Sequence, residues 1–95
     1  MFKKKKKLQL GSEDLRIIRY SLVDFRNNLN KQNRYSEPVD EIILKLKSKM
    51  KVDRYDLGII INSLTEYRKM IVSNNKNTNE VDKLILKLID LYDTL

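Results

Sequence analysis

The chain has 95 residues, a formal net charge of +7 and a hydrophobic content of 41%. A chain of this length forms one domain with a modest core, which leaves little room for a deep catalytic cleft. It contains no Cys and no His, which excludes thiol nucleophiles, disulfides, imidazole bases and nearly all zinc sites. No Gly-rich phosphate loop is present either. We therefore expect a protein that is not an enzyme and that needs no metal or cofactor.

The N-terminal segment carries most of the excess positive charge. It contains a run of five lysines, namely Lys3, Lys4, Lys5, Lys6 and Lys7. The apolar residues that follow are too few for a signal peptide, and no segment approaches the roughly 20 apolar residues of a membrane span, so we expect a cytoplasmic protein without membrane contact. We interpret residues 1–11 as a flexible basic arm that either binds nucleic-acid phosphates or only keeps the chain soluble.

Residues 12–50 predict two helices joined by a polar turn. Apolar residues recur at helical spacing over residues 15–29, and Ser12 in front of them is a favoured N-cap residue. An Asn-rich segment then ends the first helix, and Ser36 is the expected N-cap of the second. Its apolar stripe covers residues 39–50. No sustained alternation of apolar and polar residues is apparent, so strands are not expected.

Residues 53–95 predict the same arrangement a second time. Asp53 or Asp56 is expected to cap a helix whose apolar stripe covers residues 57–71. A second Asn-rich turn, the N-cap residue Thr78 and a last amphipathic helix complete this half. Each half therefore reads as helix, polar turn, helix.

The two halves are similar in sequence at a fixed offset of 42 residues. Residues 14–46 align without a gap on residues 56–88, and Asp, Ser and Arg match as well as apolar residues. Similarity at a fixed offset indicates a repeated structural unit. Since a single helical hairpin cannot bury its apolar side, we predict an all-α domain at residues 12–95, with four helices as two tandem helical hairpins (12–50 and 53–95) and pseudo-twofold symmetry.

Two repeated Arg and Asp positions predict ion pairs within the hairpins. Arg26 lies near the end of its helix and Asp40 near the start of the next, and Arg68 and Asp82 hold the same places in the second half. Antiparallel packing brings these helix ends together. We therefore predict Arg26–Asp40 and Arg68–Asp82 contacts that hold each turn in place.

Two surface features are candidates for binding a partner. A basic cluster near the junction of the halves consists of Lys45, Lys47, Lys49, Lys51 and Arg54. It is either a patch for an acidic partner or a solvated helix face. Arg34 and Tyr35 lie in the first turn, and Tyr35 is either a partner contact or part of the local packing of that turn.

Residues 1 to about 50 resemble a group of known proteins. The patterns Ser-Leu-x-x-Phe-Arg-Asn-x-Leu and Arg-Tyr-Ser-x-x-Val-Asp-Glu-Ile-Ile-x-Lys-Leu, between residues 21 and 46, and the Met-Phe start with its basic run carry the resemblance. They are similar to small uncharacterised helical proteins of phages and conjugative elements of low-GC Gram-positive bacteria. The resemblance implies a setting in which short proteins bind and block a host factor, as anti-CRISPR and other anti-defence inhibitors do.

The first functional hypothesis is a non-catalytic protein-binding module of a mobile genetic element, such as an anti-CRISPR-like inhibitor of a host defence or of a regulatory protein. Its partner is a host protein or a protein–nucleic-acid complex, contacted through Arg34, Tyr35 and the basic cluster. The alternative is a nucleic-acid-binding accessory protein or transcriptional regulator that uses the lysine run. A structural role as an oligomer subunit, such as a homodimer, is the third hypothesis, because apolar residues off the main stripes belong either to the core or to a dimer interface.

Overall fold

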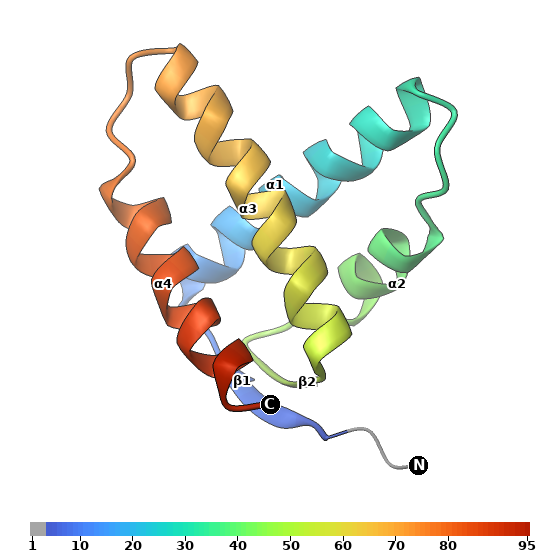
Figure 1. Cartoon of the computed structure of the whole chain (residues 1–95), viewed down its shortest axis with the longest axis vertical. Helices are drawn as coiled ribbons and strands as arrows, with labels where there is room; N and C mark the ends of the chain where they lie inside the picture. The colour runs from blue at the N-terminus through green and yellow to red at the C-terminus, as the bar shows by residue number, and fades with distance from the viewer. Residues whose placement is uncertain (1–3) are drawn as a thin grey trace.

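The computed structural model describes residues 4–95, which form four helices and a two-stranded sheet (Figure 1). In chain order the elements are β1 (Lys6–Gln9), α1 (Ser12–Lys31), α2 (Glu37–Lys45), β2 (Lys49–Val52), α3 (Arg54–Ser73) and α4 (Asn79–Asp93). The chain is therefore mostly helical, as the apolar stripes predict. α2 packs against α1, α4 packs against α3, and α1 and α3 pack against each other at the centre of the molecule.

The two long helices begin at positions 42 residues apart but with different caps. The N-cap of α1 is Gly11 rather than the expected Ser12, and it offers no side chain to the free amides. The N-cap of α3 is Asp53, whose Oδ1 accepts the amide N–H of Asp56 at 2.8 Å, while the Asp56 carboxylate accepts the N–H of Asp53 at 3.3 Å. This reciprocal capping box satisfies two backbone donors at the start of α3.

The same two helices end in the same way. Asn33 and Asn75, just beyond their last turns, have positive φ angles of 54° and 58°. Asn tolerates this left-handed conformation better than most residues. The amide that follows donates back to the carbonyl five residues earlier, at 2.8 Å after Asn33 and 3.0 Å after Asn75. The Asn-rich turns thus stop both helices through backbone conformation.

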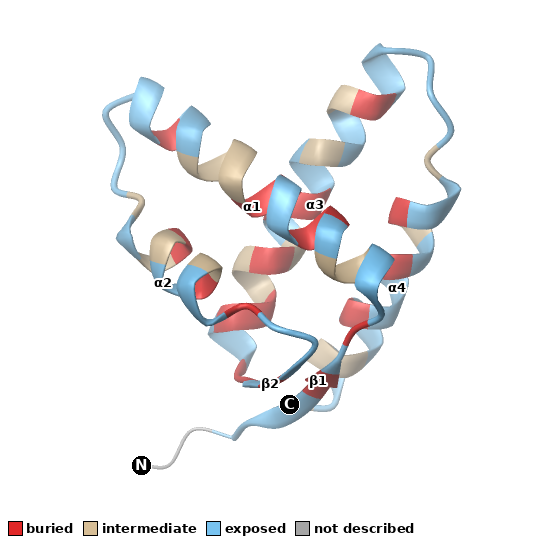
Figure 2. Ribbon diagram, turned by 180° about the vertical axis from the view of Figure 1, so that it is seen from behind, coloured by how far each residue is buried: buried red, intermediate tan, exposed pale blue. Residues whose placement is uncertain are grey.

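The buried sides of α1 and α3 face each other where the two helices cross (Figure 2). Five aliphatic side chains of these two helices have no exposed surface: Ile18, Leu22, Leu57, Ile60 and Leu64. Ser21 and Ser63 are only 1% exposed, and their hydroxyls donate to the carbonyls of Ile17 and Ile60, both at 2.8 Å. Each serine is satisfied by its own helix, so a small side chain stands at the helix contact without an unpaired polar group.

β1 and β2 pair antiparallel at one end of the molecule, beside the C-terminus (Figure 1). The paired residues are Lys6 with Val52, Lys7 with Lys51, Leu8 with Met50 and Gln9 with Lys49. Side chains alternate between the two faces of a strand. The inner face therefore joins the core, with side chains no more than 5% exposed at Leu8, Leu10, Met50 and Val52. The amide of Leu10 extends the pairing by donating to the carbonyl of Ser48 at 2.7 Å.

The antiparallel pair of β1 and β2, which we call the ribbon, corrects three expectations from the sequence. Residues 6–10 are not a free arm, strands are present, and α2 ends at Lys45 instead of continuing to Met50. The physical reason is a short alternation of lysine and apolar residues in both segments, which the lysine run conceals. Leu46 already has extended backbone angles, φ −66° and ψ 124°, and turns the chain out of the helix and towards β2. Lys3, the first lysine of the predicted arm, lies outside the described residues.

The apolar residues off the main helical stripes are mostly part of the core. Ile17 is 7% exposed, and Ile59 and Ile61 are partly buried against the core cluster. Met70 is also partly buried, whereas Ile89 is 37% exposed. Most of these residues therefore widen the buried faces of the helices.

Candidate nucleic-acid interface

The outer face of the ribbon gathers four polar side chains from two distant parts of the sequence. We name this group the ribbon face, and it consists of Lys7, Gln9, Lys49 and Lys51. All four residues are exposed, whereas Leu8 and Met50 between them are buried. The alternation of the strands thus presents three lysines and one glutamine to solvent on a surface anchored from behind by the core.

The ribbon face concentrates positive charge without internal compensation. Lys7 lies directly opposite Lys51 in the antiparallel pairing, and like charges in that position destabilise a strand pair. Within residues 4–95 no acidic side chain forms an ion pair with the lysines of the ribbon face. Lys5 and Lys47, which stand before the two strands, are exposed as well. The arrangement attracts anions to this side of the molecule.

A pocket of about 620 Å³ adjoins the ribbon face. It is lined by Lys7, Leu44, Lys45, Leu46, Lys47, Lys49, Met50 and Lys51. Leu44 is 87% exposed and shares the lining of this pocket with five lysines. The predicted residues Lys45, Lys47, Lys49 and Lys51 therefore do come together, in company with Lys7 from the N-terminal run.

Two members of the predicted basic cluster are held by other parts of the protein. The Lys45 ammonium donates to Asp56 Oδ2 at 2.9 Å, and the Asp56 side chain is only 11% exposed. The Arg54 guanidinium lies 4.4 Å from the centre of the Tyr92 ring, a cation–π contact that ties α3 to α4. Lys45 and Arg54 thus each make a contact that connects parts of the fold, and their predicted part in binding a partner stays a prediction.

A lysine in the second half has a comparable role. Lys87 Nζ donates to the backbone carbonyl of Gln9 at 3.0 Å and lies 3.9 Å from Asp14 Oδ2. Lys87 thus connects α4 to both β1 and the start of α1. Its contact with the Gln9 carbonyl fixes the backbone of β1 and leaves the glutamine side chain exposed.

Arg34 and Tyr35 lie in the connection between α1 and α2, away from the ribbon face (Figure 1). The Tyr35 hydroxyl donates to Glu37 Oε2 at 2.7 Å, and this hydrogen bond is the main reason that the pKa of Tyr35 is raised. Arg34 Nη1 donates weakly to Gln32 Oε1 at 3.4 Å. No hydrogen bond or ion pair among residues 4–95 joins either residue to the lysines, although Tyr35 is 74% exposed.

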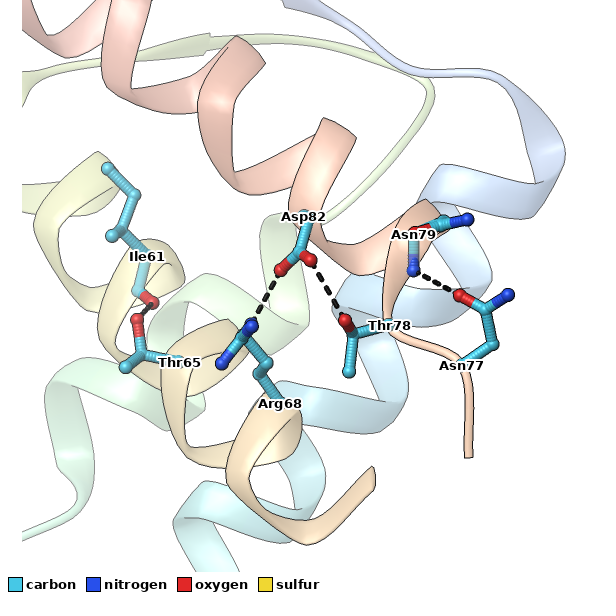
Figure 3. A network of polar contacts seen from close by, with 7 residues as sticks. All are labelled: Ile61, Thr65, Arg68, Asn77, Thr78, Asn79 and Asp82. Carbon is cyan, nitrogen blue, oxygen red and sulfur yellow. Dashed lines mark hydrogen bonds and ion pairs between the residues drawn. The ribbon is translucent and has the colours of Figure 1, made fainter. Parts of the chain in front are cut away.

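The structure brings together both predicted Arg–Asp pairs. Arg68 Nε donates to Asp82 Oδ1 at 2.6 Å, and Thr78 Oγ1 donates to Asp82 Oδ2 at 2.8 Å (Figure 3). These two hydrogen bonds to the carboxylate, that of Arg68 first, lower the pKa of Asp82. The N-cap residue Thr78 thus acts through the Asp82 side chain rather than on the helix amides.

The pair in the first half has the same partners but is looser. Arg26 Nη1 lies 3.6 Å from Asp40 Oδ1, and the Ser36 hydroxyl oxygen lies 3.4 Å from Asp40 Oδ2. The Ser36 hydroxyl donates to Asn30 Oδ1 at 2.9 Å, which ties the turn back to α1. Arg26 with Asp40 and Arg68 with Asp82 thus connect the two helices of each half.

Metal sites and membrane spans were also sought in the part of the chain that is described. Within residues 4–95 no three His, Cys, Asp or Glu side chains gather in a way that could hold a metal ion. None of the helices there has the length and apolar character needed to cross a membrane. Lys4 lies beside Asp53, Arg54 and Tyr55 in a small surface pocket, apart from the ribbon face.

The comparisons with known proteins add no assignment, since no protein-family model, curated protein or solved structure matches the chain. The site is therefore defined by geometry alone. Sequence reasoning missed Gln9 and the role of Leu8 and Leu10. A signal was present, because the offset of 42 residues extends upstream and places Lys7 on Lys49 and Leu8 on Met50.

Proposed function

We propose that the two halves are equivalent strand–helix–helix units related by a pseudo-twofold axis that passes through the ribbon. The bounds of α1 and α3, which differ by 42 residues at both ends, support this relation. The strand register supports it too. Leu8 and Met50 also differ by 42 residues and are paired with each other, as equivalent residues beside a twofold axis are.

The ion pairs between the halves agree with the same relation. At the offset of 42 residues, Asp14 corresponds to Asp56 and Lys45 corresponds to Lys87. The Lys87–Asp14 pair is therefore the counterpart of the Lys45–Asp56 pair, with the two halves exchanged. Both pairs join the end of one half to the first turn of the other half's long helix. Such a chain corresponds to a symmetric dimer whose two subunits are covalently joined.

The function that this arrangement supports best is the non-catalytic binding of duplex DNA through the ribbon face. The observation that carries it is the set of three exposed lysines and one glutamine on a two-stranded antiparallel ribbon, without any acidic partner within residues 4–95. Of the two main hypotheses from the sequence, this is the nucleic-acid one. The charge acts from a folded ribbon, however, rather than from a free arm.

The shape of the ribbon favours duplex DNA over duplex RNA. The major groove of B-form DNA is about 12 Å wide and admits a two-stranded β-ribbon, whose outward side chains then reach the base edges. The major groove of A-form RNA is deep and too narrow for this. The pseudo-twofold axis of the ribbon would coincide with the local twofold axis of the duplex, so each half of the protein would face one half-site.

The flanking lysines suit the phosphates at the edges of the groove. Lys5 and Lys47 occupy equivalent positions, two residues before Lys7 and Lys49, and all four are exposed. Phosphate contacts of this kind set affinity and orientation, while side chains in the groove set sequence preference. If these lysines neutralise about four phosphates, raising the salt concentration from 50 to 200 mM would lower the affinity for DNA roughly 100-fold.

A protein partner is the second candidate, and Leu44 is the observation in its favour. This leucine is 87% exposed in the lysine-lined pocket beside the ribbon. An acidic protein surface with an apolar contact residue would suit that pocket, and an inhibitor from a mobile element would act in this way. The ribbon geometry favours DNA, because a protein partner does not require two equivalent half-sites.

The deciding experiment measures the binding of the full-length protein to labelled DNA by fluorescence anisotropy. A 25-base-pair duplex, the corresponding single strand and a duplex RNA are compared at 50 and 200 mM salt. We expect binding to duplex DNA that weakens steeply with salt, and weaker binding to the other two ligands. Lys7→Gln with Lys49→Gln should reduce duplex affinity at least about 10-fold.

The matched control removes two exposed lysines elsewhere, in the variant Lys31→Gln with Lys83→Gln. This control variant loses the same net charge as the ribbon variant, but at sites away from the ribbon, where salt screens the effect. It should therefore alter the affinity for duplex DNA less than about 3-fold if the ribbon is the binding surface. Circular dichroism establishes that both variants fold. Equal losses in the two variants, or no binding to duplex DNA at 50 mM salt, would overturn the proposal and direct attention to a protein ligand.

A further inference from the structure

We infer that the ribbon face reads an asymmetric DNA site, with adenine opposite Gln9 and guanine opposite Lys51. This inference rests on the proposed binding of duplex DNA and adds a base preference to it. It follows from the one position on the ribbon face at which the two halves carry different residues. Lys7 and Lys49 are equivalent and identical, whereas Gln9 and Lys51 are equivalent and different.

The register determines which side chains act together. Lys7 is opposite Lys51 on one side of the central Leu8–Met50 pair, and Gln9 is opposite Lys49 on the other side. One half-site of a bound duplex therefore faces two lysines, and the other half-site faces one glutamine and one lysine. A strictly palindromic sequence cannot satisfy both sides equally well.

The chemistry of the two side chains separates the bases they prefer. A lysine ammonium only donates, and it suits the O6 and N7 acceptors of guanine in the major groove. A glutamine amide both donates and accepts, and it suits the N7 acceptor together with the N6 amino group of adenine. Exchanging Gln9 and Lys51 therefore exchanges the bases expected at the two positions.

The backbone of Gln9 is held well enough for such a contact. Its carbonyl accepts the Lys87 ammonium at 3.0 Å, and its neighbours Leu8 and Leu10 are buried at 2% and 4% exposure. Its side chain is exposed and makes no hydrogen bond within the described residues 4–95. The side chain is therefore free to bind a base while the strand that carries it is anchored.

The test selects preferred duplexes from a random 20-base-pair pool with the full-length protein. Wild type should enrich a site with adenine in one half and guanine at the matching position of the other. Gln9→Lys should enrich a symmetric site with guanine in both halves, and Lys51→Gln a symmetric site with adenine in both. Each single variant should bind its own symmetric site roughly 5- to 150-fold more tightly than the wild-type site.

The double exchange, Gln9→Lys with Lys51→Gln, is the matched control. It keeps composition and net charge, and it should bind the wild-type site within about 3-fold because an asymmetric site can be bound in either direction. A symmetric wild-type consensus, no consensus despite DNA binding, or an unchanged base preference in Gln9→Lys would overturn the inference and leave DNA binding itself intact. Absence of any duplex binding would overturn both proposals.

Discussion

Replacing Leu8 by Ala is expected to destabilise the domain strongly, although Leu8 directly follows the lysine run. Its side chain is 2% exposed and sits in the core between the ribbon and the helices. Leu-to-Ala changes at buried sites reduce the free energy of unfolding by about 2–5 kcal/mol. The ribbon lies at the end of the molecule and can partly close the cavity, so we expect about 2–4 kcal/mol. A domain of this size has about 5–14 kcal/mol in total, so the variant still folds.

The measurement is urea unfolding followed by circular dichroism, with thermal unfolding as a second readout. The expected loss corresponds to a fall in Tm of roughly 10–25 °C for a domain of this length. Gln9→Ala is the control, because it changes the neighbouring exposed residue and should alter stability by no more than about 0.5 kcal/mol. If Leu8→Ala is as mild as Gln9→Ala, the N-terminal segment is not part of the core and the ribbon does not form.

Three further changes test the polar contacts and one helix position. Arg68→Gln should lower Tm at neutral pH. The difference in Tm from wild type should shrink as the pH falls through the lowered pKa of Asp82, because the native contact stabilises the carboxylate only while it is ionised. A difference in Tm that does not change between pH 7 and pH 2 would contradict this. Asp56→Ala removes a capping partner and a buried ion-pair acceptor, and it should lower the free energy of unfolding in urea by about 2–3 kcal/mol. Asp14→Ala is the control, since the ion pair of Asp14 is longer and more exposed, and it should cost less than about 1 kcal/mol. Equal losses in the two variants would count against the capping box. Gly58→Ala should raise the free energy of unfolding by about 0.5–1 kcal/mol, since a Cβ there meets nothing within 4 Å and the residue lies inside α3; a loss of stability would show that the site is crowded.

The helices could be predicted from the sequence because their signals are local and repeated. Apolar spacing, acidic first turns and Asn-rich turns each act within a few residues, and the duplication presents every signal twice. The pairing of Arg26 with Asp40 and of Arg68 with Asp82 could be predicted for the same reason, since neighbouring helix ends must meet. These features depend little on how the two halves are placed.

The ribbon was missed because its strands are four residues long and separated by α1 and α2, so that only the upstream extension of the 42-residue offset pointed to it. Such a strand has too few residues for a period-two pattern to stand out, and its partner is distant in the sequence. The contacts of two residues in the predicted basic cluster could not be foreseen for a related reason. Lys45 and Arg54 have the composition of a basic surface, but their contacts with Asp56 and Tyr92 arise only in the folded chain.

The distance between the two strands along the chain has a consequence for biosynthesis. At about 5–20 residues per second, the ribosome completes β2 roughly 2–9 s after β1, and during that time β1 has no partner. Leu8 and Leu10 are then exposed on a strand that could pair with another nascent chain. The adjacent lysines repel a second copy of the same segment, as charged residues beside aggregation-prone strands commonly do. The lysines beside β1 would thus limit the association of nascent chains until β2 is available to pair with β1.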